Sequence, residues 1–252
     1  MEESIHFKDN YSQKPTFSLH NSPVDNVATL VSINMKDAIL FQERTTFKIS
    51  VDNGNVIRTA EFKQGFHNIS HVLLELSQKL EVNVHRFDVM NNSNKCEIIS
   101  VQPFELEGMG NNMEEMKNRS SDWSYLGFSN HFVSSIKLSD RKYGLISVNT
   151  IGNKNDPFHI NICEEGKPDI SLWKSPSNNN ITFSGVINQG KITIDKERNC
   201  VLIKNDVREL MIIFTSIGNR DHYYTLYTGI CVALYLEDVD MIQKKLSLFG
   251  NN

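Results

Sequence analysis

Short runs of alternating apolar and polar residues recur along the chain, and they constrain the fold more than any other feature. Phe47, Ile49 and Val51 alternate with polar residues, and Phe158, Ile160 and Ile162 repeat the pattern. A period of two is typical of strands with one buried face. Roughly ten strands can be read in this way, in hairpin-like succession, against three or four short helices. We therefore predict a mainly β fold with peripheral helices (α+β), arranged as a jelly-roll-like β-sandwich.

The 252 residues are enough for one large domain or two small ones. Residues 1–26 are polar with few apolar anchors, so they are either a frayed terminus or an arm, in part helical, that orders against a neighbouring molecule. No linker interrupts the rest, and residues 27–252 are predicted to form a single β-sandwich domain. The most apolar stretch, 223–236, favours a central strand and leaves a buried helix as the alternative, and 237–249 has the pattern of a terminal helix.

The segment 46–71 holds an ambiguity in its centre. Asp52-Asn53-Gly54 suits a hairpin turn, because Asn-Gly tolerates positive φ. It also suits a helix N-terminus, with Val56, Ile57, Ala60 and Phe62 as an apolar face that stops at Gly65. We favour the helix. Ser70 is then expected to cap a second helix over residues 71–80.

Composition excludes several classes of function. The formal net charge is −4, which gives no basic surface for nucleic acid. No apolar run is long enough for a membrane span, and the N-terminus lacks the pattern of a signal peptide, so we expect an intracellular protein. The cysteines are far apart in sequence and are expected to be reduced: Cys96, Cys163, Cys200 and Cys231.

Motifs for catalysis are missing. The glycines of Gly108-Met109-Gly110 lie in a polar stretch without the pattern of a phosphate-binding turn, and no serine lies in GxSxG. His67 and His71 have the i, i+4 spacing of helical metal ligands, but Gly65 and Ser70 interrupt the helix, so we assign them structural roles. The sequence predicts no enzyme, no catalytic residues, no metal and no cofactor.

Tyr223, Tyr224 and Tyr227 form a small cluster near the C-terminus. Packing alone explains such a cluster, and a response to alkaline pH is the functional alternative. A Tyr hydroxyl titrates at about pH 10, and burial disfavours the phenolate. Stability then falls as the pH rises through the value of the unfolded chain.

One family resemblance is carried by residues 46–68. Thr46-Phe47-Lys48-Ile49 is followed, about a dozen residues later, by the run Glu61-Phe62-Lys63-Gln64-Gly65-Phe66-His67-Asn68. This pattern resembles the polyhedrins of cypoviruses, the cytoplasmic polyhedrosis viruses of insects, and residues 27–40 lie where that family has a β-hairpin. Residues 121–132 and 146–157 give weaker similarities, and the resemblance covers about a third of the chain.

The resemblance implies a non-enzymatic structural protein with a β-sandwich core. Such proteins form homotrimers that pack into crystals in the host cytoplasm, and these occlusion bodies embed and protect virus particles until alkali dissolves them. The partners implied are further copies of the chain and virions, without nucleic acid or membrane.

Two other functions fit the same composition. A lipid-associated β-barrel of the tubby or scramblase kind requires a central buried helix over residues 223–236. A β-sandwich module that binds glycans or small ligands requires Trp123 or Trp173 to be exposed as a platform.

Overall fold

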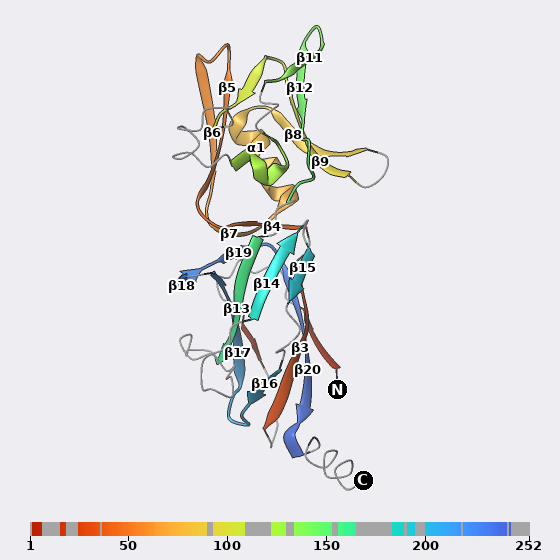
Figure 1. Ribbon diagram of the computed structural model, residues 1–252, viewed down its shortest axis with the longest axis vertical. Coiled ribbons are helices and arrows are strands. Elements are labelled where there is room, and N and C mark those ends of the chain that lie inside the picture. The colour runs from red at the N-terminus through yellow and green to blue at the C-terminus, as the bar shows by residue number, and fades with distance from the viewer. Residues whose placement is uncertain are drawn as a thin grey trace. The chain divides into compact units, whose positions relative to one another are not determined.

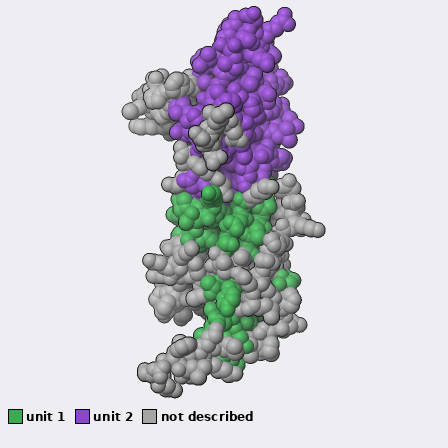
Figure 2. All heavy atoms as spheres, turned by 90° about the vertical axis from the view of Figure 1, so that its right-hand side faces the viewer, with its two compact units in different colours: residues 1–36, 157–186, 191–252 green, residues 37–156, 187–190 purple. Residues whose placement is uncertain are grey.

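The computed structural model describes residues 2–6, 16–18, 25–35, 37–89, 93–108, 122–129, 134–152, 156–164, 183–188, 191–194, 200–217, 219–240 and 242. Its contacts divide the chain into two compact units (Figures 1 and 2). Unit 1 comprises residues 1–36, 157–186 and 191–252, and unit 2 comprises residues 37–156 and 187–190. The sequence predicted a single domain over residues 27–252. The division falls beside or within strands and not in a linker, so composition gives no sign of it.

Unit 1 is built from β-strands, and the pairings described for β1, β2, β3, β16, β17, β18 and β20 are antiparallel. Its strands are β1 (Glu2–His6), β2 (Thr16–Ser18), β3 (Asn26–Met35), β13 (Asp156–Glu164), β14 (Phe183–Asn188), β15 (Lys191–Ile194), β16 (Cys200–Ile203), β17 (Glu209–Ser216), β18 (Asn219–Tyr223), β19 (Thr225–Tyr227) and β20 (Ile230–Asp238). One sheet has the order β1-β20-β3-β16 and a second has the order β15-β14-β13-β17-β18, with β2 also paired to β17. The longest pairing joins β3 to β20, which are far apart in sequence.

Unit 2 contains the α-helix that the structure describes in full. Its elements are β4 (Ala38–Phe41), β5 (Thr45–Val51), β6 (Val56–Phe62), β7 (Gly65–Asn68), α1 (Ile69–Leu80), β8 (Asn83–Val89), β9 (Ser93–Ser100), β10 (Phe104–Leu106), the 3-10 helix η1 (Asp122–Leu126), β11 (Ile136–Ser139) and β12 (Lys142–Ile146). The sheets are β10-β5-β6 and β11-β12-β9-β8, and β4 pairs with β7. The prediction of a mainly β, sandwich-like fold is confirmed.

The core of unit 2 lies where α1 meets the two larger sheets (Figure 1). Phe47 and Ile49 of β5 are buried in this core, and so are Cys96 and Ile98 of β9. The helix contributes an apolar stripe at helical spacing, made of Ile69, Val72, Leu73, Leu76 and Leu80. Because both sheets and the helix bury side chains in one cluster, a substitution in any of them is expected to destabilise the unit as a whole.

The turn after β5 is a hairpin, and the favoured helix over residues 52–65 is wrong. β5 and β6 pair antiparallel from Val51 opposite Val56 onward. Asp52, Asn53 and Gly54 all have positive φ, which a right-handed helix does not permit. In β6, Val56 and Ile57 are exposed, whereas Ala60 and Phe62 are buried, as a strand requires.

The predicted second helix is confirmed, but its cap is Asn68 and not Ser70. Asn68 has extended φ and ψ, and its side chain accepts a hydrogen bond from the backbone N–H of His71 at 3.2 Å. Ser70 lies inside the first turn and donates to Asp37 Oδ2 at 3.0 Å. Arg86 pairs with the same carboxylate at 2.6 Å, so Asp37 ties the helix start to β8.

Replacing Asn68 by Ala is expected to lower the free energy of unfolding by about 1 kcal/mol, because the backbone N–H of His71 loses its acceptor. Asn68→Asp and Asn68→Ser retain an acceptor and are expected to stay close to the parent protein. Denaturant titration followed by circular dichroism measures the difference. Equal midpoints for the Ala and Ser variants would contradict this assignment of the cap.

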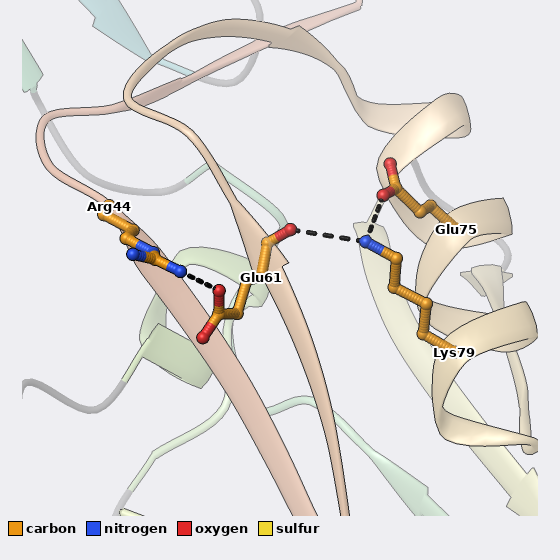
Figure 3. A network of polar contacts seen from close by, with 4 residues as sticks. All are labelled: Arg44, Glu61, Glu75 and Lys79. Carbon is orange, nitrogen blue, oxygen red and sulfur yellow. Dashed lines mark hydrogen bonds and ion pairs between the residues drawn. The ribbon is translucent and has the colours of Figure 1, made fainter.

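Polar contacts hold the helix beside the β5–β6 hairpin (Figure 3). Lys79 pairs with Glu75 at 2.6 Å and reaches the backbone oxygen of Glu61 at 3.5 Å. The Glu61 carboxylate forms an ion pair with Arg44, which precedes β5. Arg58 of β6 donates to the Leu80 carbonyl oxygen at 3.0 Å, so one carbonyl group of the last helical turn has a side-chain donor. The ion pairs are largely exposed, so they orient the helix more than they stabilise it.

Other expectations differ from the observed pairing. The described parts of the N-terminal arm are the strands β1 and β2, where a short helix was one alternative. Residues 27–40 do not form a hairpin: β3 pairs with β20 and β16, and β4 pairs with β7. Residues 223–236 fall in β18, β19 and β20 and do not form a buried helix. Because β20 lies between β1 and β3, the predicted central strand is confirmed for residues 230–236, whereas residues 223–227 belong to shorter strands. Most of 237–249 lies outside the described residues.

Candidate functional site

The structure separates the three tyrosines. Across residues 223–227 burial alternates, with Tyr224 and Leu226 buried and the positions between them half-buried. Such alternation places Tyr224 on one side of the chain and Tyr223 and Tyr227 on the other. The predicted cluster is therefore two half-buried phenols and one core residue.

Tyr224 is the most deeply buried of the three, with 1% of its surface exposed. Its backbone N–H donates to the Phe214 carbonyl oxygen at 2.8 Å, which fixes it against β17. Tyr223 lies opposite Thr215 and packs on the buried group of Cys163, Met211 and Ile213. If ionisation of a tyrosine destabilises the folded chain in alkali, the largest effect is expected from Tyr224, because a phenolate is poorly solvated in a core.

His67 is a core residue on β7. Its Nε2 lies 2.8 Å from the Lys63 carbonyl oxygen, and its ring centroid lies 4.9 Å from that of Phe41 and 5.8 Å from that of Phe62. Burial lowers the pKa of His67 to about 4, against the opposing effects of the Lys63 carbonyl and the Glu75 carboxylate. His71 is exposed on α1. Within the described residues no three His, Cys, Asp or Glu side chains group as metal ligands.

Cys96, Cys163 and Cys231 are free thiols. Cys96 and Cys163 are buried and Cys231 is half-buried. Burial raises the pKa of the Cys96 thiol far above its usual value, with the nearby Glu97 carboxylate adding to the effect. A thiol held protonated in this way is a poor nucleophile. Its place beside Ile98 in the core marks it as a packing residue.

One surface of unit 2 shows an arrangement that the sequence analysis did not identify. In the sheet β11-β12-β9-β8, the paired residues Val84, Ile98 and Leu145 are buried in the core. Neighbouring positions point to the opposite side of the sheet, which we call the outer face. It is made of two cross-strand rows: Asn83–Ile99–Gly144–Ile136 and His85–Glu97–Ile146.

The half of the outer face on β11 and β12 is apolar and open. Ile136 is 64% exposed, Leu138 is 56% exposed and Ile146 is 42% exposed. Leu138 lies over Gly144, because a Cβ on Gly144 would come within 2.6 Å of Leu138 Cδ1. A glycine at this position therefore lets an apolar side chain fold over the sheet surface.

The half of the outer face on β8 and β9 is polar. His85 Nε2 lies 2.7 Å from Glu97 Oε2, and the Glu97 side chain is largely covered. The next cross-strand pair along the same face is Phe87 with Lys95. The outer face thus combines an apolar half with a half that carries both signs of charge.

Doublets of apolar residues were the signal for this face. Ile98-Ile99 and Leu145-Ile146 place one apolar side chain in the core and the next on the outside. A strand with one buried face and one solvated face normally alternates apolar with polar residues. Two such doublets on paired strands therefore indicate an apolar outer face.

The aromatic platform required for glycan binding is not formed by Trp123. Its side chain is fully buried, and its indole N–H donates to the Lys48 carbonyl oxygen at 2.9 Å. Trp173 lies outside the described residues. The described helices include none that is long and apolar enough to cross a membrane.

Comparisons of the chain with protein-family models, with curated proteins and with solved structures found no match.

Proposed function

We propose that this chain is a structural protein that assembles with copies of itself into intracellular crystals, as the matrix of viral occlusion bodies. The observation that carries the proposal is the pairing of the two segments that resemble cypovirus polyhedrins. Thr46 lies opposite Glu61 and Phe47 opposite Ala60 on the hairpin β5–β6. The two segments, which are about a dozen residues apart in the sequence, thus pair as strands of one β-hairpin.

The same element contributes to the core of unit 2. Phe47 and Phe62 are buried with ring centroids 5.7 Å apart, and His67 packs on Phe62. The resemblance therefore covers residues that determine packing as well as surface positions. The mainly β, sandwich-like fold of the chain is also consistent with the proposal.

Expression of the full chain in insect cells tests the function directly. We expect refractile crystals in the cytoplasm that dissolve above about pH 10, near the value for a Tyr hydroxyl. Protein released at that pH and returned to neutrality is expected to form oligomers. A chain that stays a soluble monomer at neutral pH, in cells and after concentration, would overturn the proposal.

Changing Tyr223, Tyr224 and Tyr227 together to Phe is expected to raise the pH of dissolution by on the order of one unit, because the buried side chain of Tyr224 can no longer ionise. Tyr224→Phe alone is expected to give most of this shift, since Tyr224 is the buried one. Turbidity of isolated particles against pH provides the measurement. Tyr143→Phe, in unit 2, is the matched control.

An unchanged threshold in the triple variant would dismiss the tyrosines as the trigger of dissolution. It would leave the proposal of self-assembly intact, because particle formation at neutral pH is scored separately.

A further inference from the structure

Asn53 and Gly54 lie at the tip of the β5–β6 hairpin and form the single Asn-Gly pair of the sequence. Val51 opposite Val56 closes the turn, and residues 52–55 are all exposed. Gly54 has a φ of 90°, and no atom outside its chain neighbours lies within 4 Å of the position that a Cβ would take there. Because glycine has no side chain, its backbone nitrogen is open to close approach by a neighbouring group.

We propose that Asn53 is a site of covalent modification that needs only water, in which the side-chain amide is lost. The Gly54 backbone nitrogen attacks Cγ of Asn53, a C–N bond forms, and ammonia leaves with the proton of the attacking N–H group. Water then opens the resulting succinimide ring at one of its two carbonyl groups. Opening at the former side-chain carbonyl gives aspartate. Opening at the Asn53 backbone carbonyl leads the chain through Cβ and Cγ and gives isoaspartate.

The residue that follows distinguishes Asn53 from Asn55. Asn55 lies in the same exposed turn but precedes Val56, whose branched side chain crowds the nitrogen that would attack. The Asn55 amide also donates to the Asp52 carboxylate at 3.5 Å, whereas the Asn53 side chain makes no hydrogen bond within the part of the chain that the structure describes. Asn53 is therefore expected to lose its amide on the order of tenfold faster than Asn55, or more.

The folded turn opposes the reaction only weakly. The Gly54 N–H donates to the Val51 carbonyl oxygen at 3.2 Å, and the Asn55 N–H donates to the Asp52 carbonyl oxygen at 3.1 Å. Both distances are at the long end of the usual range. Local opening of an exposed loop tip costs little free energy, and it releases the Gly54 nitrogen without unfolding the core.

Isoaspartate changes the hairpin more than aspartate does. It adds a backbone atom between Asp52 and Gly54, so the two hydrogen bonds of the turn cannot both be kept. The turn fixes the register of a hairpin, and β5 and β6 bury Phe47 and Phe62 in the core of unit 2. The modification is thus an age-dependent loss of stability, whichever assembly the chain forms.

The test incubates the full-length parent chain in mildly alkaline water labelled with heavy oxygen and follows residues 52–56 by peptide mass spectrometry. Heavy oxygen enters wherever a ring is hydrolysed, so the label excludes modification that occurred before the incubation. Asn53→Gly is the matched control, because Gly-Gly suits the positive φ of the turn and has no amide to lose. Asn53→Asp represents the product with normal linkage, and the parent chain in urea measures the reaction without the folded turn.

We expect label in the folded parent at Asn53, as aspartate and isoaspartate, on the order of tenfold or more above the label at Asn55. The thermal midpoint of the aged parent is expected to fall by about 2–4 °C, because hydrogen bonds of the turn are lost. Aged Asn53→Gly and fresh Asn53→Asp are expected to show no such fall. Label at Asn53 in urea but not in the folded chain would overturn the inference, and equal label at Asn53 and Asn55 would contradict the role of Gly54.

Discussion

Trp123→Ala is expected to lower the free energy of unfolding by about 4 kcal/mol, in the range for a fully buried large aromatic residue. The indole is fully buried in the core of unit 2, and its ring centroid lies 5.0 Å from that of Phe47 and 5.7 Å from that of Phe128. Its removal leaves a cavity between η1 and β5 and deprives the Lys48 carbonyl of its indole donor. Equilibrium denaturation followed by circular dichroism measures the loss.

Trp123→Phe separates the two contributions. Phenylalanine fills much of the volume but lacks the N–H group, so the Lys48 carbonyl oxygen loses this hydrogen bond and keeps the one from the Glu107 backbone N–H. The loss of the single hydrogen bond is expected to cost about 0.5–1.5 kcal/mol. Hydrogen exchange gives a local readout, because amides of β5 are expected to exchange faster in both variants. A loss below about 1 kcal/mol for Trp123→Ala would contradict a central role for this indole.

Local pattern predicted much of the strand content, because a period of two is a property of neighbouring residues. β5 and β13 follow from their alternating side chains. The hairpin between β5 and β6 was not predicted correctly, since Val56, Ile57, Ala60 and Phe62 also fit one face of a helix. Three consecutive residues with positive φ decide against the helix, and Asn53-Gly54, which tolerates this conformation, was the signal in the sequence for the hairpin.

Pairing between strands that are far apart in the sequence could not be predicted from local pattern. β3 pairs with β20, so the arrangement of that sheet depends on contacts between the two ends of the chain. The same limit affected the tyrosines. Proximity in sequence suggested a cluster, whereas burial alternates over residues 223–227 and separates the buried Tyr224 from Tyr223 and Tyr227. The outer face was not predicted, because an apolar doublet such as Leu145-Ile146 does not show which of its side chains is buried. Only the pairing register of the strands assigns Leu145 to the core and Ile146 to the outer face.

The largest pH effect is expected from His67 in acid. Its pKa is about 4 in the folded chain, because burial disfavours the imidazolium, against 6.5 in the unfolded chain. Between these values the unfolded chain binds more protons, so the free energy of unfolding falls as the pH falls. The difference corresponds to about 3 kcal/mol, lost between pH 6.5 and pH 4, and His67 adds no pH dependence above that window.

His67→Gln removes the titrating ring and keeps a side-chain donor for the Lys63 carbonyl. Its own packing defect is expected to cost stability at neutral pH, so the informative quantity is the difference from the parent as a function of pH. That difference is expected to shift in favour of the variant by about 3 kcal/mol on going from pH 7 to pH 4. Parallel stability curves would contradict the assignment, and the exposed His71→Gln is expected to retain the parent's acid loss.

The two titrations act at opposite ends of the pH scale, and this makes them separable in one experiment. His67 destabilises the folded chain only below neutrality, whereas ionisation of a buried phenol acts only in alkali. A stability curve for His67→Gln should therefore differ in shape from that of the parent on its acid side alone, and the triple Tyr→Phe variant on its alkaline side alone. If His67→Gln also changed the alkaline side, the two groups would be coupled through a shared opening of the chain. Release in alkali would then reflect unfolding of the core of unit 2 as well as loosening around Tyr224.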